Sequence, residues 1–249
     1  MAIYLCHQEP GLLVHDAEVV ASRPGAVALS RSAFHPGGGG QVSDRGHITW
    51  SGASDASGGE ADVTGIEIDG DTWWHLLDRD VEPSGTVPSG VVEVRVDGDH
   101  RHRVASLHTM SHVLNAFVFD EFAGALVTGA QINGDGTGRM DFDLPEVDNE
   151  RVRALEAPVN DVIARGLAVR SVYVDAGDAE AVAGLVRSMS VAPPPTPDGL
   201  LRIIDIDGLD RQACGGTHLS NTAESPLIRI TKVENKGRHN RRVRFVFAE

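Results

Sequence analysis

The chain has 249 residues, 41% of them hydrophobic, and its only cysteines are Cys6 and Cys214. This composition is that of one large or two medium globular domains, and two cysteines exclude a disulfide framework. The sequence holds no apolar run of about 18 residues and no signal-peptide pattern, so we expect a cytoplasmic protein without a membrane segment. The net charge of −14 argues against nucleic acid as a partner, since Lys and Arg bind phosphate.

The charge is unevenly distributed along the chain. Residues 1–97 carry fifteen acidic and five basic side chains, a net charge of about −10, whereas residues 98–249 carry twenty-one and seventeen, about −4. This asymmetry predicts two domains, 1–97 and 98–249.

Residues 1–97 consist of short alternating segments separated by clusters of Gly, Pro, Ser and Asp. Such a pattern predicts a small β-barrel or sandwich. The polar stretch 51–60 is expected to be a mobile insertion, and 82–90 a hairpin loop or the start of a linker. The expected strands are 17–21, 27–31, 46–50, 72–76 and 91–96.

A run of four glycines directly precedes Gln41. Glycine lets the backbone approach a ligand closely, and an amide side chain can then hydrogen-bond it. The run lacks the spacing of a dinucleotide or P-loop fingerprint, so taken alone it favours a flexible hairpin loop. The candidate substrate contacts in this segment are Gly38, Gly39, Gly40 and Gln41.

After residue 98 the pattern becomes mixed α and β. Residues 104–121 have the apolar spacing of a helix, 146–165 are predicted to form a second helix, and the prolines at 193–197 end a short helical segment. This order predicts an α+β domain with an antiparallel sheet. The expected strands are 139–144, 169–174, 200–206, 227–234 and 241–247.

Two pairs of residues with metal-ligand chemistry lie about a hundred positions apart. His108 and His112 are spaced i, i+4 and share one face of the predicted helix, while the glycines between Cys214 and His218 indicate a tight turn. Because tetrahedral Zn²⁺ prefers Cys and His, the four predict one zinc site assembled from two segments.

The ligand set is compatible with two uses of the zinc. One thiolate and up to three neutral imidazoles leave a charge near +1, able to polarise a carbonyl or activate water for hydrolysis. Thr109 and Met110 stand where a His-Glu-x-x-His peptidase carries its Glu, which excludes that mechanism. Four protein ligands would equally suit a structural zinc, and buried core histidines beside a buried thiol are a further alternative.

Basic side chains gather near the C-terminus. Residues 229–244 contain seven of them and a single acid, Glu234, and a second cluster lies at His100-Arg-His-Arg103. Such clusters suit a polyanion, although a solvated charged face is the alternative.

Four ordered motifs together resemble the free-standing alanyl-tRNA editing proteins, AlaX, relatives of the editing domains of alanyl- and threonyl-tRNA synthetases. The motifs cover nearly the whole chain. They are Phe34-His-Pro-Gly-Gly-Gly-Gly-Gln-Val-Ser-Asp-Arg-Gly46, His108-Thr-Met-Ser-His112, Ala213-Cys-Gly-Gly-Thr-His-Leu-Ser-Asn-Thr-Ala-Glu224 and Asn235-Lys-Gly-Arg-His-Asn-Arg-Arg-Val-Arg-Phe245. Departures from the family pattern include His35, His239 and the Ala-Glu-Ser at 223–225.

The resemblance implies a zinc-dependent deacylase that hydrolyses the ester between a wrong amino acid and the tRNA 3′ adenosine. His108, His112, Cys214 and His218 would hold the zinc and form the catalytic site, with an aminoacylated tRNA as partner and no protein partner. The implied substrate is seryl-tRNA(Ala), with glycyl-tRNA(Ala) as a second target.

Specificity would then depend on side chains around the zinc. By resemblance Thr128 senses the hydroxyl of the substrate, Gln131 and Gln41 are lesser candidates, and backbone N–H groups at Gly215 and Gly216 stabilise the oxyanion. An ordinary strand-end Thr is the alternative for Thr128. The candidate tRNA contacts are Arg101, Arg103, Lys232, Lys236, Arg238, Arg241 and Arg242.

Two alternatives to this function stay open at the level of sequence. Arg outnumbers Lys twenty to two, a bias of GC-rich genomes whose bacteria make unusual amino acids, so the substrate could be a threonine analogue such as fluorothreonine on tRNA(Thr). A non-catalytic RNA-binding module with a structural zinc would use the same basic strands.

Overall fold

A computed structural model of the chain describes residues 3–51, 58–78, 90–145, 148–181, 185, 187–189 and 199–248. The chain divides into two compact units, Met1–Gly38 with Val42–His102 (unit 1) and Gly39–Gln41 with Arg103–Glu249 (unit 2). The division at residue 97 stays a prediction. The segments predicted to form an insertion (51–60), a loop or linker (82–90) and the end of a helical segment (193–197) lie wholly or largely outside the described residues.

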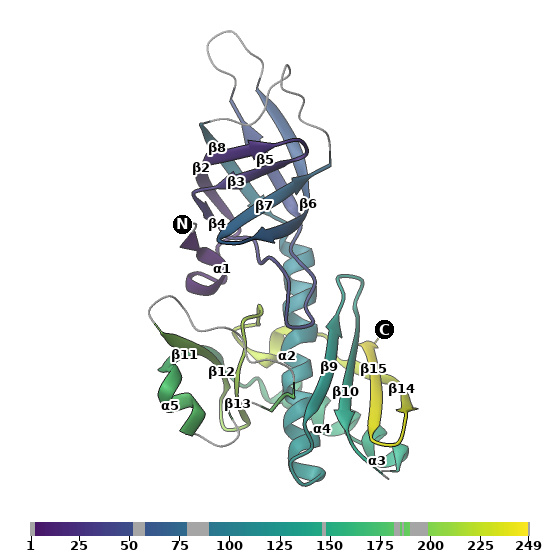
Figure 1. Cartoon of the computed structure of the whole chain (residues 1–249). Coiled ribbons are helices and arrows are strands. Elements are labelled where there is room, and N and C mark those ends of the chain that lie inside the picture. The colour runs from purple at the N-terminus through teal and green to yellow at the C-terminus, as the bar shows by residue number, and fades with distance from the viewer. Residues whose placement is uncertain are drawn as a thin grey trace. The chain divides into compact units, whose positions relative to one another are not determined.

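Unit 1 contains a closed barrel of six antiparallel strands in the order β2-β3-β7-β6-β5-β8 (Figure 1). The alternation expected from the sequence produces it: in β8 every second residue is buried, and Val92, Val94 and Val96 pack in the barrel core. The predicted small barrel is therefore confirmed. Its strands are β2 (Val14–Arg23), β3 (Ala26–Leu29), β5 (Gly46–Trp50), β6 (Gly59–Asp69), β7 (Thr72–Leu77) and β8 (Val91–Val96).

Two short elements precede the barrel strands, and a third follows β3 and leads into the loop before β5. The loop is closed at its base, where Asp44 N–H donates to His35 O at 2.9 Å and the Asp44 carboxylate accepts from His35 N–H. Arg101 binds the same carboxylate. The short elements are β1 (Ile3–Tyr4), α1 (Leu5–Gln8) and β4 (Arg31–Ser32), with β1 and β4 parallel.

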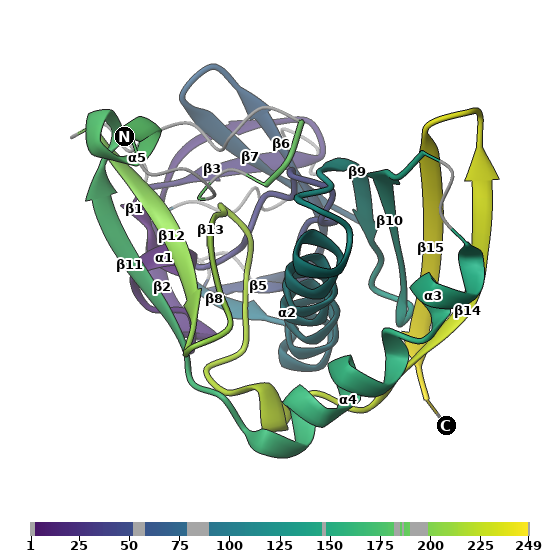
Figure 2. The same ribbon diagram turned by 90° about the horizontal axis from the view of Figure 1, so that it is seen from below.

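Helix α2 (Gly98–Glu121) starts in the last residues of unit 1 and forms the centre of unit 2. It begins earlier than the predicted 104–121, because the Asp97 carboxylate accepts from the His100 N–H and caps an N-terminal turn that lacks apolar periodicity. Figure 2 shows α2 between two antiparallel sheets.

The first sheet of unit 2 has the order β14-β15-β10-β9 and the second β11-β12-β13. The predicted α+β class with an antiparallel sheet is thereby confirmed. The strands are β9 (Val127–Ile132), β10 (Thr137–Asp143), β11 (Val169–Asp175), β12 (Leu200–Ile206), β13 (Asp210–Ala213), β14 (Ile228–Lys236) and β15 (Asn240–Phe247).

The second predicted helix, 146–165, is divided into α3 (Asn149–Arg153) and α4 (Glu156–Arg165). Pro158 cannot donate a backbone hydrogen bond, so it fits only in the first turn of a helix, and α4 starts anew just before it. The remaining elements of unit 2 are α5 (Ala176–Ala181) and the 3-10 turn η1 (Thr222–Glu224).

Both outer edges of the four-stranded sheet are covered. At β14, Asn160 of α4 exchanges hydrogen bonds with the backbone of Ile228 at 2.9 Å, which satisfies an exposed strand edge. At β9, Ile132 N–H donates to Gly40 O at 2.7 Å and Gln41 forms a parallel bridge with Ile132. This pairing fixes Gln41 within unit 2.

Across the described residues, none of the helices is both long and apolar enough to cross a membrane.

Candidate metal centre

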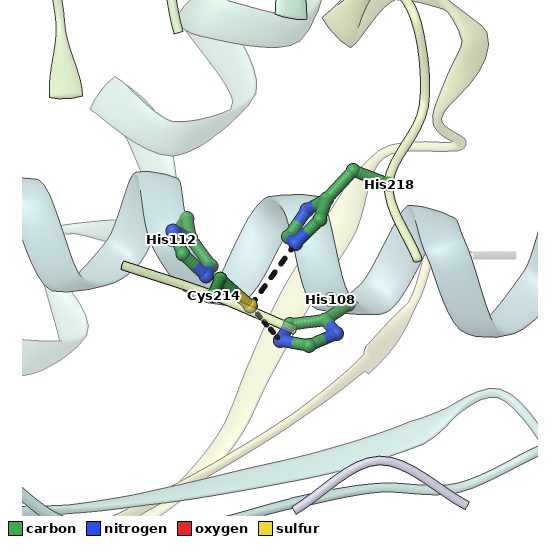
Figure 3. Close-up of side chains that lie close together, drawn as sticks. All are labelled: His108, His112, Cys214 and His218. Atoms are coloured by element: carbon green, nitrogen blue, oxygen red, sulfur yellow. Dashed lines mark hydrogen bonds between the residues drawn. The ribbon is translucent and has the colours of Figure 1, made fainter. Parts of the chain in front are cut away.

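Two elements carry the four predicted ligands to one point. Helix α2 places His108 and His112 one turn apart, with ring centroids 5.4 Å from each other, and the turn after β13 supplies Cys214 and His218. Their four potential ligand atoms all lie within 4.8 Å of one another. Figure 3 shows the side chains converging on the Cys214 sulfur.

The spacing of these atoms fits a single tetrahedral ion. The Cys214 Sγ lies 3.4 Å from His108 Nε2 and 3.3 Å from His218 Nε2. Zinc bonds to nitrogen and sulfur of about 2.0 and 2.3 Å, held at a tetrahedral angle, separate two such ligand atoms by about 3.5 Å. The group could therefore hold a metal ion.

Each imidazole has a polar group near its outer nitrogen: two of these nitrogens are hydrogen-bonded, and that of His112 only lies near a carboxylate. His108 Nδ1 lies 2.6 Å from the amide oxygen of Gln41. His218 Nδ1 lies 3.3 Å from the Thr109 hydroxyl. For His112, Nδ1 lies 3.5 Å from the Asp210 carboxylate. Outer partners of this kind orient metal-binding histidines and fix their tautomer.

The Asp210 carboxylate is itself held by a buried network. Gln212 donates to it at 2.6 Å, Asn115 of α2 donates to Gln212 at 2.7 Å, and Arg187 approaches its other oxygen at 2.9 Å. Because α2 and β13 both contribute, the network fixes the carboxylate relative to His112.

Arg202 of β12 holds the turn that carries Cys214. Its guanidinium donates to the carbonyl oxygens of Cys214 at 2.8 Å and Gly216 at 2.9 Å, and the side chain is buried. Gly216 lies so close to His108 that an added methyl group would overlap the imidazole ring. The second glycine of the turn is thus required by space rather than by backbone conformation.

The electrostatics of the group favour the ligand form of the sulfur. Burial opposes ionisation of the Cys214 thiol, but the charges of His108, His218 and His112 outweigh it and hold the thiol pKa well below its usual value. Burial likewise lowers the pKa of His112, yet Cys214 and Asp210 together raise it above the ordinary range. A thiolate is the form in which Cys binds metal.

Of the predicted substrate contacts, Gln41 lies directly against the ligands. Gly40 is packed against the Ala130 backbone, whereas Gly38 and Gly39 have open space where side chains would stand. On β9, the Thr128 hydroxyl donates to Asn240 Oδ1 at 3.2 Å. Gln131 binds Asn133 and Arg139.

One backbone donor assigned from the sequence has another use. The Gly216 N–H points to Cys214 Sγ at 3.4 Å, so it is occupied by the sulfur and not open to an oxyanion. This bond argues against the oxyanion role predicted for Gly216, and the role predicted for Gly215 stays a prediction.

Two predicted tRNA contacts are buried, which argues against that role. Arg101 binds Asp44 and the carbonyl oxygens of Pro10 and Ala33, and Arg241 is 6% exposed. A guanidinium enclosed in this way cannot reach a phosphate group. The others are accessible: Arg103, Lys232, Lys236 and Arg238 are exposed, and Arg242 is half-buried beside Asp141.

Sequence reasoning missed Asp210 and Arg202, and it missed the contact of Thr109 with His218. A carboxylate four residues before Cys214 is the one available signal, because ligating histidines commonly bind carboxylates. Arg202 and Thr109 carry no such signal, since their partners are backbone carbonyls and a ring nitrogen that only the fold brings near.

Comparison with known proteins identifies the chain's relatives. The family described as "Threonyl and Alanyl tRNA synthetase second additional domain" matches residues 201–244. The alanine–tRNA ligase of Korarchaeum cryptofilum is 33% identical over 91% of this chain, which spans only 24% of that ligase.

Shorter relatives match over nearly their whole length. The alanyl-tRNA editing protein AlaX-M of Methanosarcina barkeri is 33% identical over 90% of this chain and 89% of its own. That of Saccharolobus solfataricus is 32% identical over 92% of this chain and 91% of its own. The chain therefore belongs to the family of the alanyl-tRNA editing proteins AlaX-M.

Proposed function

We propose that this protein is a zinc-dependent aminoacyl-tRNA deacylase that acts in trans in the cytoplasm and hydrolyses the ester of a mischarged tRNA. Its membership among the alanyl-tRNA editing proteins supports the class of reaction. The observation that carries the proposal is the convergence of His108, His112, Cys214 and His218 within 4.8 Å.

The four side chains would hold the ion, and their chemistry selects zinc, since a thiolate with imidazoles is a soft and borderline donor set. When bound, zinc supplies a Lewis acid for the ester carbonyl or for water. The chain's own part is orientation: Gln41, Asp210 and Thr109 hold the three imidazoles, and Arg202 holds the turn of Cys214.

As substrate we propose seryl-tRNA(Ala), with glycyl-tRNA(Ala) as a second target. Thr128 is the proposed contact to the serine hydroxyl. Serine and alanine differ by one hydroxyl group, and a site that hydrogen-bonds this group favours serine, which would spare alanyl-tRNA.

The exposed cations of the β14-β15 region are the proposed tRNA surface. Phosphate groups are bound by such side chains without regard to sequence, which would position the acceptor end. The proposed contacts are Arg103, Lys232, Lys236, Arg238 and Arg242.

A structural zinc in a non-catalytic RNA-binding module is the rival function, favoured by the presence of four candidate protein ligands. Hydrolysis of Ser-, Gly-, Ala-, Thr- and fluorothreonyl-tRNA, measured with and without a chelator, separates the two. We expect Ser-tRNA(Ala) hydrolysis that the chelator and His108→Ala abolish, with tRNA affinity nearly unchanged. No hydrolysis of any substrate would leave the binding module as the function.

A further inference from the structure

Gln41 is buried, with 4% of its surface exposed, and its amide is oriented without ambiguity. Its Oε1 accepts from the backbone N–H of Thr217 at 3.0 Å, and its Nε2 donates to the Thr217 hydroxyl at 3.0 Å. A backbone N–H can only donate, so the atom facing it must be the amide oxygen.

This orientation determines the tautomer of His108. The same Oε1 lies 2.6 Å from His108 Nδ1, and an oxygen acceptor at that position requires a proton on Nδ1. In a neutral imidazole, Nε2 then carries the free lone pair, and Nε2 faces the Cys214 sulfur at 3.4 Å. The ring therefore presents a ligand lone pair to the point where the other candidate ligands meet.

The oxygen of Gln41 has no capacity left for a substrate. A carbonyl oxygen has two lone pairs, and Thr217 N–H and His108 Nδ1 occupy both. A substrate hydroxyl could not donate to it without breaking one of these bonds.

The backbone of the preceding residue holds Gln41 in place. Gly40 O accepts from Ile132 N–H, and a Cβ on Gly40 would stand 2.6 Å from Ala130 O, too close for any side chain. The close approach of residue 40 to β9 thus needs glycine. This approach determines the backbone position from which the Gln41 side chain reaches His108.

We propose that Gln41 is a positioning residue for the metal ligand His108, which it holds in the metal-binding tautomer, and not a contact to the amino acid. The inference rests on the metal site of the proposed function and replaces the substrate-binding role expected of Gln41 from the sequence.

The test measures Zn²⁺ affinity of the full-length protein in the absence of tRNA, by competition with a chromophoric chelator. Gln41→Met removes both polar ends at similar volume, and we expect it to weaken Zn²⁺ binding about 10- to 100-fold, as for other outer partners of metal ligands. Gln41→Glu keeps an acceptor for both donors and should retain most of the affinity. Gln8→Met, at an exposed position of α1, is the matched control and should bind as the wild type does.

Nitrogen NMR of the histidine side chains gives a second reading. The wild type and Gln41→Glu should show His108 protonated at Nδ1, while Gln41→Met should lose that preference. Wild-type Zn²⁺ affinity in Gln41→Met, with a raised KM for acyl-tRNA, would make Gln41 a substrate contact and overturn the inference alone. Absence of Zn²⁺ binding by the wild-type protein would overturn the proposed metal site and this inference with it.

Discussion

At the scale of single residues, the candidate metal centre depends on groups that touch the ligands rather than on the ligands alone. An amide and a hydroxyl hydrogen-bond two of the imidazoles, a carboxylate lies 3.5 Å from the third, and a buried guanidinium binds the turn that carries the sulfur. Ligands fixed in this way lose little freedom when a metal binds.

Gly216 offers a test of this fixation. An alanine there would place its methyl group on the His108 ring and 2.7 Å from Gln41 Oε1, so the ring must move. We expect Gly216→Ala to weaken Zn²⁺ affinity about 10-fold or more. Gly129→Ala is the control, because its nearest neighbour would stand 3.5 Å away in ordinary contact. Equal Zn²⁺ affinity in both variants would show that the turn tolerates a side chain.

Thr128 offers a test of specificity. Its hydroxyl hydrogen is directed to Asn240, so its oxygen can accept from a substrate hydroxyl. We expect Thr128→Val to lower kcat/KM for Ser-tRNA(Ala) about 10-fold, the value of one hydrogen bond, with little change for Gly-tRNA(Ala). Thr231→Val, an exposed position on β14, serves as control. An equal loss on both substrates would assign Thr128 a structural role only.

At the scale of elements, the turn between β14 and β15 carries two exposed cations of unit 2. Lys236 and Arg238 are both exposed, flanking the left-handed Gly237 with its φ of 75°. A protruding turn of this kind can reach phosphate groups without desolvating its charges, so it makes the most direct test of the proposed tRNA surface.

We expect Lys236→Ala combined with Arg238→Ala to weaken tRNA binding uniformly across tRNA sequences. The dependence of log Kd on log salt should become shallower by about 0.7–0.9 for each phosphate contact removed. Filter binding at several salt concentrations measures both quantities. Arg170→Ala, an exposed cation on β11, should leave the salt slope as it is. An unchanged slope in the double variant would move the tRNA surface elsewhere.

At the scale of the whole molecule, the barrel of unit 1 gives the fold a pH dependence of its own. His75 is fully buried, with Nδ1 donating to Val27 O at 3.2 Å and Nε2 accepting from Ser32 Oγ at 2.8 Å. Burial lowers the pKa of His75 from 6.5 to about 4, so the folded state keeps this ring neutral. Burial lowers the pKa of His15 as well.

Between pH 6.5 and pH 4 the unfolded chain binds a proton at residue 75 that the folded barrel does not. The contribution of His75 to the free energy of unfolding is therefore fully present above pH 6.5 and is lost as the pH falls. At pH 4 the loss from His75 amounts to about 3 kcal/mol. The three tryptophans, Trp50, Trp73 and Trp74, all belong to the barrel, so urea unfolding followed by their fluorescence reports this unit.

The expected result is a loss of unfolding free energy on going from pH 7 to pH 5 that His75→Gln reduces. Thr49→Val, which exchanges a partly exposed residue of β5 without changing a titratable group, is the control and should keep the wild-type pH dependence. A flat profile in the wild type would mean that His75 is charged in the folded state.

The sequence by itself determined the α+β class, the small barrel and the family, because alternating strands and four ordered motifs are local patterns. It also supplied the four candidate ligands, since each pair of ligands lies at i, i+4 spacing within one short segment and can be recognised there. Helix ends and the division at Pro158 were harder, because capping and proline effects act over single residues.

Only the tertiary structure decided which polar side chains surround those ligands. Gln41 lies 67 residues from His108 in the chain, and Arg202 binds carbonyl oxygens that any sequence would possess. The tertiary structure also decided the partner of Arg101: its charge suits a tRNA phosphate, but in the fold it is buried against Asp44. A residue type states what a group can bind, but its neighbours in space select the one partner it does bind, and long-range packing sets those neighbours.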